Sequence, residues 1–127
     1  MAEKFTNYLF QETMSVNQTF TVIDQAGYNG RQTGSVCQIH SLYITQIHDG
    51  VPSNPEDLAA TVSLIIESNA SKEYMIANNV LILPNSSFYI EKTITLKPTD
   101  RLKIKYTGLK STSSKTISVV CSAVDLY

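Results

Sequence analysis

The two histidines of this 127-residue chain are its first candidates for metal or acid–base chemistry. His40 and His48 are eight positions apart. On one extended strand this spacing would place both side chains on one face but about 25 Å apart, too far to share a metal ion. The motifs H-E-x-x-H and C-x-x-C are typical of zinc sites, and neither histidine lies in one of them. We therefore expect no metal site and no cofactor.

Other catalytic signals are also missing. No G-x-S-x-G segment is present, and the glycines at 27, 30 and 34 match neither the dinucleotide-binding nor the P-loop pattern. The adjacent acids Glu56 and Asp57 are typical of a solvated helix start rather than of a tuned carboxylate pair. An enzyme would need a pocket that unites a histidine with an acid, and we expect that the chain is not an enzyme.

Three features of the sequence indicate whether the protein is secreted or membrane-bound: the first residues, the length of the apolar runs and the cysteines. MAEKFTNYLF has a polar break at Thr6 and Asn7, so we expect no secretory signal. The longest apolar runs, such as 80–83, have four residues, whereas a membrane helix needs about 18, so we expect no membrane partner. Cys37 and Cys121 are predicted to be buried thiols, with a disulfide between them as the alternative.

Charge is sparse and unevenly distributed. Charged residues make up 17% of the chain, the net charge is −1, and Ser, Thr and Asn number 14, 13 and 8. This balance excludes a strongly basic nucleic-acid binder and predicts a hydroxyl-rich surface. Residues 1–91 hold three Lys/Arg and nine Asp/Glu, while residues 92–127 hold seven and two. An acidic body is therefore followed by a basic segment, which we expect to surround one hairpin.

Lys103 and Lys105 alternate with apolar residues, which predicts that both point away from the core. Outward lysines typically protect an edge strand from aggregation. They are alternatively a contact surface for the acidic face of a neighbouring subunit. Nucleic-acid binding is the least favoured interpretation, because few aromatic residues are interleaved with the basic ones.

Apolar and polar residues alternate with a period of two along most of the chain, which predicts strands with one buried face. The clearest cover 62–67, 102–106 and 117–123. Shorter candidates, rich in β-branched or aromatic residues, cover 16–23, 36–47, 74–83, 88–91 and 93–96. Turn-forming residues separate these segments, and no helical period intervenes.

This rhythm predicts an all-β fold, namely an antiparallel β-sandwich of the jelly-roll type with about eight strands. We expect one domain over residues 16–127, because a chain of this size builds a single core. Residues 1–15, rich in aromatics, are predicted to be either a first strand or an arm that docks on a neighbouring subunit. Residues 49–60 are predicted to form a long loop with a short helical turn near Pro55.

Five segments follow one another in a distinctive order: VCQIHSLYIT (36–45), TVSLIIESNAS (61–71), ILPNSSFYI (82–90), LKPTDRLKIKY (96–106) and ISVVCSAVDL (117–126). This order resembles that of small β-sandwich structural proteins of tailed bacteriophages, such as head decoration, collar or tail-associated subunits. Relative to that group, Thr99 replaces the usual glycine before Asp100. The replacement predicts a type I turn without positive φ, with Pro98 in its second position.

The resemblance implies a non-enzymatic virion structural protein that self-assembles in the host bacterial cytoplasm and docks on the capsid, neck or tail. Its expected partners are other copies of itself and phage capsid, neck or tail proteins, without nucleic acid or membrane. Candidate subunit-interface residues are Phe5, Tyr8, Leu9, Phe10, Lys103 and Lys105. Candidate residues of a contact loop, in the segment that looks like an insertion, are Val51, Pro52, Asn54, Pro55, Glu56 and Asp57. The alternative is a receptor- or carbohydrate-binding module on a phage tail, with tyrosines stacked on sugars.

Overall fold

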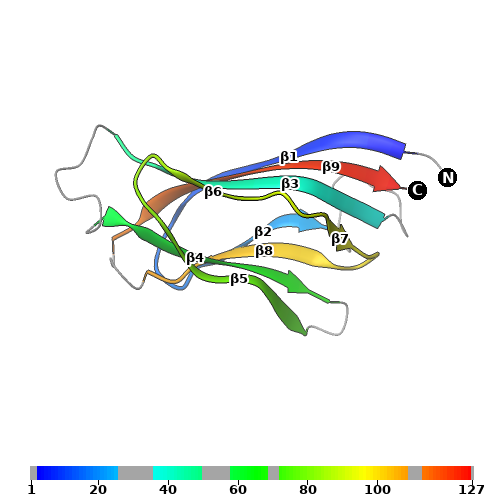
Figure 1. Cartoon of the computed structure of the whole chain (residues 1–127). Coiled ribbons are helices and arrows are strands. Elements are labelled where there is room, and N and C mark those ends of the chain that lie inside the picture. The colour runs from blue at the N-terminus through cyan, green and yellow to red at the C-terminus, as the bar shows by residue number, and fades with distance from the viewer. Residues whose placement is uncertain (1–2, 26–35, 50–57, 69–71, 109–112, 127) are drawn as a thin grey trace.

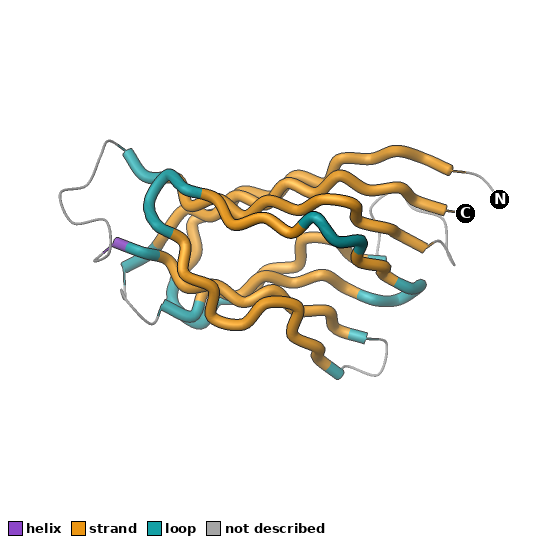
Figure 2. Tube along the Cα trace, viewed as in Figure 1, coloured by secondary structure: helices purple, strands orange, loops and turns teal. Residues whose placement is uncertain are grey.

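The alternating segments all form strands. The computed structural model describes residues 3–25, 36–49, 58–68, 72–108 and 113–126, and strands make up most of them (Figure 2). The nine strands among these residues are β1 (Glu3–Met14), β2 (Thr19–Asp24), β3 (Val36–Ile47), β4 (Ala60–Glu67), β5 (Glu73–Ile82), β6 (Ser87–Ile90), β7 (Ile94–Leu96), β8 (Arg101–Tyr106) and β9 (Lys115–Leu126). Their positions match the predicted segments closely, although nine strands replace the expected eight.

The strands form two antiparallel sheets that pack face to face (Figure 1). Sheet A has the order β1-β9-β3-β6, and β7 also pairs with β3. Sheet B has the order β2-β8-β4-β5. Glu3 pairs with Leu126, so the start of β1 and the end of β9 lie side by side. The predicted all-β, jelly-roll-like sandwich is confirmed.

The core lies between the two sheets, and in β3, β8 and β9 it consists mainly of every second residue. Leu102, Ile104 and Tyr106 of β8 are fully buried. Ile117, Val119 and Cys121 of β9 are fully buried as well. Burying each such large side chain stabilises the fold by about 1.5–3 kcal/mol. β8 and β9 therefore have the buried face that alternation predicts, whereas β4 differs, because Ala60 to Ile65 are all buried and Ile66 is only partly buried.

The predicted basic hairpin is wrong. β8 pairs with β2 and β4 in sheet B, whereas β9 pairs with β1 and β3 in sheet A. β8 and β9 therefore lie in different sheets and form no hairpin. Alternation shows which residues face the core, but it carries no information about which strands are neighbours.

The turn at 97–100 also differs from the prediction. Thr99 has a φ of 75°, so the turn places a threonine in the left-handed region, where glycine is usual. The backbone N–H of Asp100 donates to the carbonyl of Lys97 at 3.0 Å, which closes the turn. The Asp100 carboxylate accepts from the N–H of Lys97 at 3.0 Å. These two bonds hold Thr99 in a conformation that its β-branched side chain disfavours.

Candidate functional site

A row of exposed apolar side chains crosses the outer face of sheet A. Leu9 of β1 pairs with Val120 of β9, Val120 pairs with Tyr43 of β3, and Tyr43 pairs with Tyr89 of β6. Their exposed fractions are 74%, 37%, 42% and 57%, respectively. The rings of Tyr43 and Tyr89 are 5.8 Å apart. These four residues, the outer apolar row, form a continuous band over four strands.

Uncharged polar side chains flank this row on both sides. On one side Asn7, Ser122 and Ser41 are in register, and the Ser122 hydroxyl donates to Asn7 Oδ1 at 3.3 Å. On the other side lie Gln11, Ser118, Thr45 and Ser87. Within the described strands β1, β9, β3 and β6, this face carries one formal charge, that of Glu3. An apolar band with a neutral polar border is typical of a surface that binds another protein.

Sheet B presents a different outer face, which is charged and internally paired. Lys103 Nζ lies 2.8 Å from Glu67 Oε2. Arg101 lies 3.3 Å from Glu67 Oε1 and 3.2 Å from Asp24 Oδ1. The hydrogen bond from Lys103, together with the two positive charges, lowers the pKa of the Glu67 carboxyl. The acidic and basic segments of the chain thus neutralise each other here.

The four aromatic and apolar interface candidates in β1 divide between its two faces. Phe5 and Leu9 point outward and are 79% and 74% exposed. Tyr8 and Phe10 point toward the core and are partly buried. The Tyr8 hydroxyl donates to the Asp125 carboxylate, and the Phe10 ring lies 5.7 Å from that of Phe20. Phe5 and Leu9 are thus the most exposed of these four candidates, whereas Tyr8 and Phe10 also contact groups within the chain.

The edge-protection interpretation of Lys103 and Lys105 is wrong. Their strand, β8, lies between β2 and β4 and is not at an edge. Both residues lie on the outer face of sheet B, as their alternation predicted. Lys103 is engaged by Glu67, which leaves Lys105 as the better candidate for a contact outside the chain. All six candidates of the contact loop, and the predicted helical turn near Pro55, lie outside the described residues.

A second exposed apolar group lies on and just after β5, but it forms no row. Its members are Tyr74, Met75, Leu81 and Leu83. Tyr74 and Met75 are adjacent and so point to opposite faces, and Lys72 Nζ lies 5.5 Å from the centre of the Tyr74 ring. The register of β5 against β4 shifts twice, which interrupts its alternation. This strand therefore presents no continuous apolar surface.

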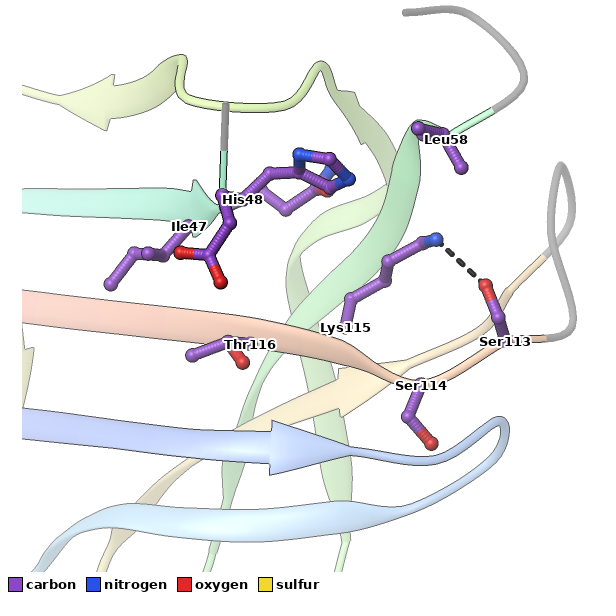
Figure 3. Close-up of a pocket in the computed structure, with 9 residues that line it drawn as sticks. Ile47, His48, Leu58, Ser113, Ser114, Lys115 and Thr116 are labelled. Carbon is purple, nitrogen blue, oxygen red and sulfur yellow. Dashed lines mark hydrogen bonds between the residues drawn. The ribbon is translucent and has the colours of Figure 1, made fainter. Parts of the chain in front are cut away.

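A cavity of about 440 Å³ lies at the end of the sandwich where β3 ends and β9 begins (Figure 3). It brings together His48, Asp49 and Lys115, whose Nζ donates to Ser113 Oγ at 2.7 Å. The Nδ1 atom of His48 is buried and has no hydrogen-bond partner. No carboxylate therefore orients the ring through that nitrogen, as Ser-His-Asp chemistry requires. The cavity lining therefore includes a histidine and an acid, but among the described residues no hydrogen bond or ion pair joins their side chains.

The structure also shows the state of the two cysteines and the position of His40. Cys37 and Cys121 are both buried and no disulfide joins them. Burial raises the pKa of the Cys121 thiol to about 12. His40 is exposed at a register shift of β3. In the part of the chain that is described, no group of three or more His, Cys, Asp or Glu is arranged to hold a metal, and no helix is suited to crossing a membrane.

Sequence reasoning missed Val120, which lies at the centre of the outer apolar row. Its signal is faint but readable: Val120 stands between Ser118 and Ser122 on the polar side of an alternating strand. From the sequence, the tyrosines are candidates only for stacking on sugars, and no pattern singles out Tyr43 or Tyr89. The row itself was not predictable, because its four residues come from strands that become neighbours only in the folded chain.

Comparison with known proteins places the fold but no family. No family model matches the chain, and no curated protein sequence matches it. A structure of infectious bursal disease virus, Gx strain, has a TM-score of 0.56 at 12% identity over 98% of this chain and 32% of that chain. A chain of the cyanophage Pam1 capsid asymmetric unit has a TM-score of 0.50 at 12% identity over 96% of this chain and 84% of that chain. The chain thus has the jelly-roll fold of capsid proteins.

Proposed function

We propose that this chain is a structural subunit of a bacteriophage virion, which assembles with copies of itself and docks on the capsid, neck or tail. The observation that carries this proposal is the outer face of sheet A, where an apolar row is bordered by neutral polar side chains. Water-exposed apolar area of this kind is stabilised when a protein partner covers it. The fold supports the same role, since it is the fold of the cyanophage capsid chain.

The arrangement of charge also supports a packing role over an enzymatic one. On the outer face of sheet B, Arg101 and Lys103 are paired within the chain with Glu67 and Asp24. The outer face of sheet A needs almost no charge compensation, so a partner covers it without burying unpaired ions. We place the protein in the virion as a decoration, cement or collar subunit, and we assign it no catalysis.

The test is incorporation into particles. The tagged chain is produced in cells infected with the phage that encodes it, and particles are separated by density-gradient sedimentation. We expect the wild-type chain in the particle fraction and Tyr43→Lys depleted from it by at least about tenfold, because the substitution buries a charge in the contact. A wild-type chain that stays wholly in the soluble fraction would refute the proposal.

A matched control separates this contact from a general effect of charge. Leu81 is 49% exposed on β5, similar to Tyr43 at 42%, but it lies in sheet B. Leu81→Lys should therefore reach particles as well as the wild-type chain does. Equal depletion of both variants would show that the outer face of sheet A has no special role.

Carbohydrate or receptor binding on a phage tail is the second candidate, and the Tyr43–Tyr89 pair favours it. Two exposed tyrosine rings 5.8 Å apart form an aromatic platform on which a sugar ring can stack. A glycan array tests this function directly. Binding that Tyr89→Ala abolishes would support it, and an array without hits would count against it.

A further inference from the structure

The free edge of β1 differs from every other sheet edge in the described residues. β1 has 12 residues and pairs with β9 without a register shift. The edge strand β5 has two register shifts and β2 has one. The other edge of sheet A consists of β6 and β7, which have four and three residues. Bulges and short strands protect edges from pairing, and β1 has neither protection.

An unprotected edge strand of this length favours pairing with a strand from another chain. The outer side of β1 presents backbone N–H and C=O groups that no described strand engages. A second copy of β1 is suited to this position, because antiparallel pairing of a strand with itself gives a two-fold symmetric contact. Such a contact closes after two copies and leaves no further β1 edge.

The two faces of β1 limit the registers that such pairing allows. Even-numbered residues such as Tyr8 and Phe10 face the core side, while odd-numbered residues such as Leu9 face outward. An antiparallel pair keeps these faces aligned only when even residues lie opposite even residues. The two-fold axis must therefore pass beside a residue, not between two residues.

Charge selects one of the remaining registers. The charged residues of β1 are Glu3, Lys4 and Glu12, and all three are exposed. With the axis beside Tyr8, Lys4 lies opposite Glu12 of the second copy, and the symmetry repeats this pair. Shifting either strand by two residues leaves Lys4 opposite Phe10 or Met14 instead. Opposite charges directly across two strands stabilise the pair.

The same register also joins the exposed apolar side chains. Leu9 then lies opposite Asn7 of the second copy. Its diagonal neighbours across the two strands are Phe5 and Leu9 of that copy, and long side chains reach each other at this spacing. Phe5 and Leu9 are the two most exposed large apolar residues of β1. The outer apolar rows of the two subunits would meet at the axis and form one band.

From these observations we infer that two copies of this chain pair through β1, antiparallel, with the two-fold axis beside Tyr8 and with reciprocal Lys4–Glu12 contacts. The inference rests on the proposed self-assembly and specifies the surface that carries it. It differs from the role in which Lys4 and Glu12 only guard the edge against pairing. Guarding charges weaken association, so their removal would strengthen it.

Charge reversal in the full-length chain distinguishes these roles. Sedimentation equilibrium up to about 100 µM should show a dimer. Lys4→Glu and Glu12→Lys should each weaken dimerisation at least about tenfold, and the chain with both substitutions should recover to within about threefold of wild type. A monomeric wild-type chain, unaffected single variants, an unrescued double variant or a stronger dimer in Lys4→Ala would each overturn the inference.

Cross-linking tests the register independently of affinity. Asn7 and Leu9 are exposed, so a cysteine at either position leaves the core intact. On mild oxidation, a mixture of Asn7→Cys and Leu9→Cys chains should form mixed cross-linked dimers at least about fivefold faster than Asn7→Cys forms dimers with itself. Equal rates would refute the register. A chain that enters particles but fails this test would leave the virion role standing and remove only the β1 pairing.

Discussion

Two residues, Thr99 and Cys121, are in unfavourable local environments that the strand patterns do not reveal. Thr99 adopts a positive φ in a turn closed by Asp100. Cys121 is a thiol in an apolar core, where its ionised form is strongly disfavoured. The conformation of Thr99 follows from the hydrogen bonds of its turn, and the state of Cys121 follows from its burial in the core. Each leads to a measurable change in stability.

Replacing Thr99 by glycine should stabilise the protein. The left-handed conformation costs a non-glycine residue about 1–2 kcal/mol, and the greater freedom of glycine in the unfolded chain cancels part of this gain. We expect Thr99→Gly to raise the free energy of unfolding by about 0.5–1 kcal/mol in urea titrations. The control Thr95→Gly, in the regular strand β7, should lower it by a similar amount. A Thr99→Gly chain no more stable than wild type would contradict this prediction.

Cys121 should make stability fall at high pH. Its pKa is raised to about 12 in the folded chain, whereas an unfolded thiol titrates near 8.5. Between these values the unfolded state binds fewer protons than the folded state, so stability decreases as pH rises. Relative to Cys121→Ala, the wild-type chain should lose up to about 1.4 kcal/mol per pH unit above pH 9. The difference between the two chains should be constant below pH 8.

At the scale of elements, the position of β8 decides the role of its lysines. Because β8 lies between β2 and β4, Arg101 reaches Asp24 on one side and Glu67 on the other. Lys103 also pairs with Glu67. The basic segment thus serves the stability of its own sheet. Lys105 lies on the same face, opposite Ser63 and Thr19, neither of which carries charge.

Substituting the two lysines should therefore have unequal effects. Lys103→Met should lower the urea midpoint more than Lys105→Met, because only Lys103 bonds Glu67. The pKa of Glu67 is lowered, so its contribution is present above the ordinary carboxyl range and is lost as pH falls through the lowered value. The difference between Lys103→Met and wild type should consequently shrink in acid. Identical midpoints for the two variants at pH 7 would contradict the pairing.

At the scale of the whole molecule, distant parts of the chain form the main contacts. β1 and β9 pair along their full length, so that Thr6 bonds Asp125 across 119 positions of sequence. The β1–β9 part of sheet A therefore cannot form until residues far apart in the sequence have met. Loop closure of this size must precede the contacts that reward it, which slows folding.

Refolding should accordingly take milliseconds to seconds rather than microseconds. Stopped-flow dilution from urea, followed by tyrosine fluorescence because the chain has no tryptophan, measures this rate. Asn7→Ala, which loses only an exposed bond to Ser122, serves as a control and should refold at nearly the wild-type rate. A sub-millisecond main phase would show that local contacts dominate folding.

The sequence by itself determined the positions of the strands and, in β8 and β9, their buried faces. Side-chain direction in a strand follows from a local period of two, so the core residues of β8 and β9 were readable from alternation alone. The same rule placed Lys103 and Lys105 outside the core. The jelly-roll class followed from the number and spacing of the strands.

Only the tertiary structure decided which strands are neighbours. It turned β8 from an expected edge into a central strand and paired the basic segment with Asp24 and Glu67. It also aligned Leu9 with Tyr89 across two intervening strands into one apolar row. Of the two histidines, His40 is exposed at a register shift of β3, and His48 lines a polar cavity. Strand order and register depend on the packing of the entire core, and no local pattern encodes them.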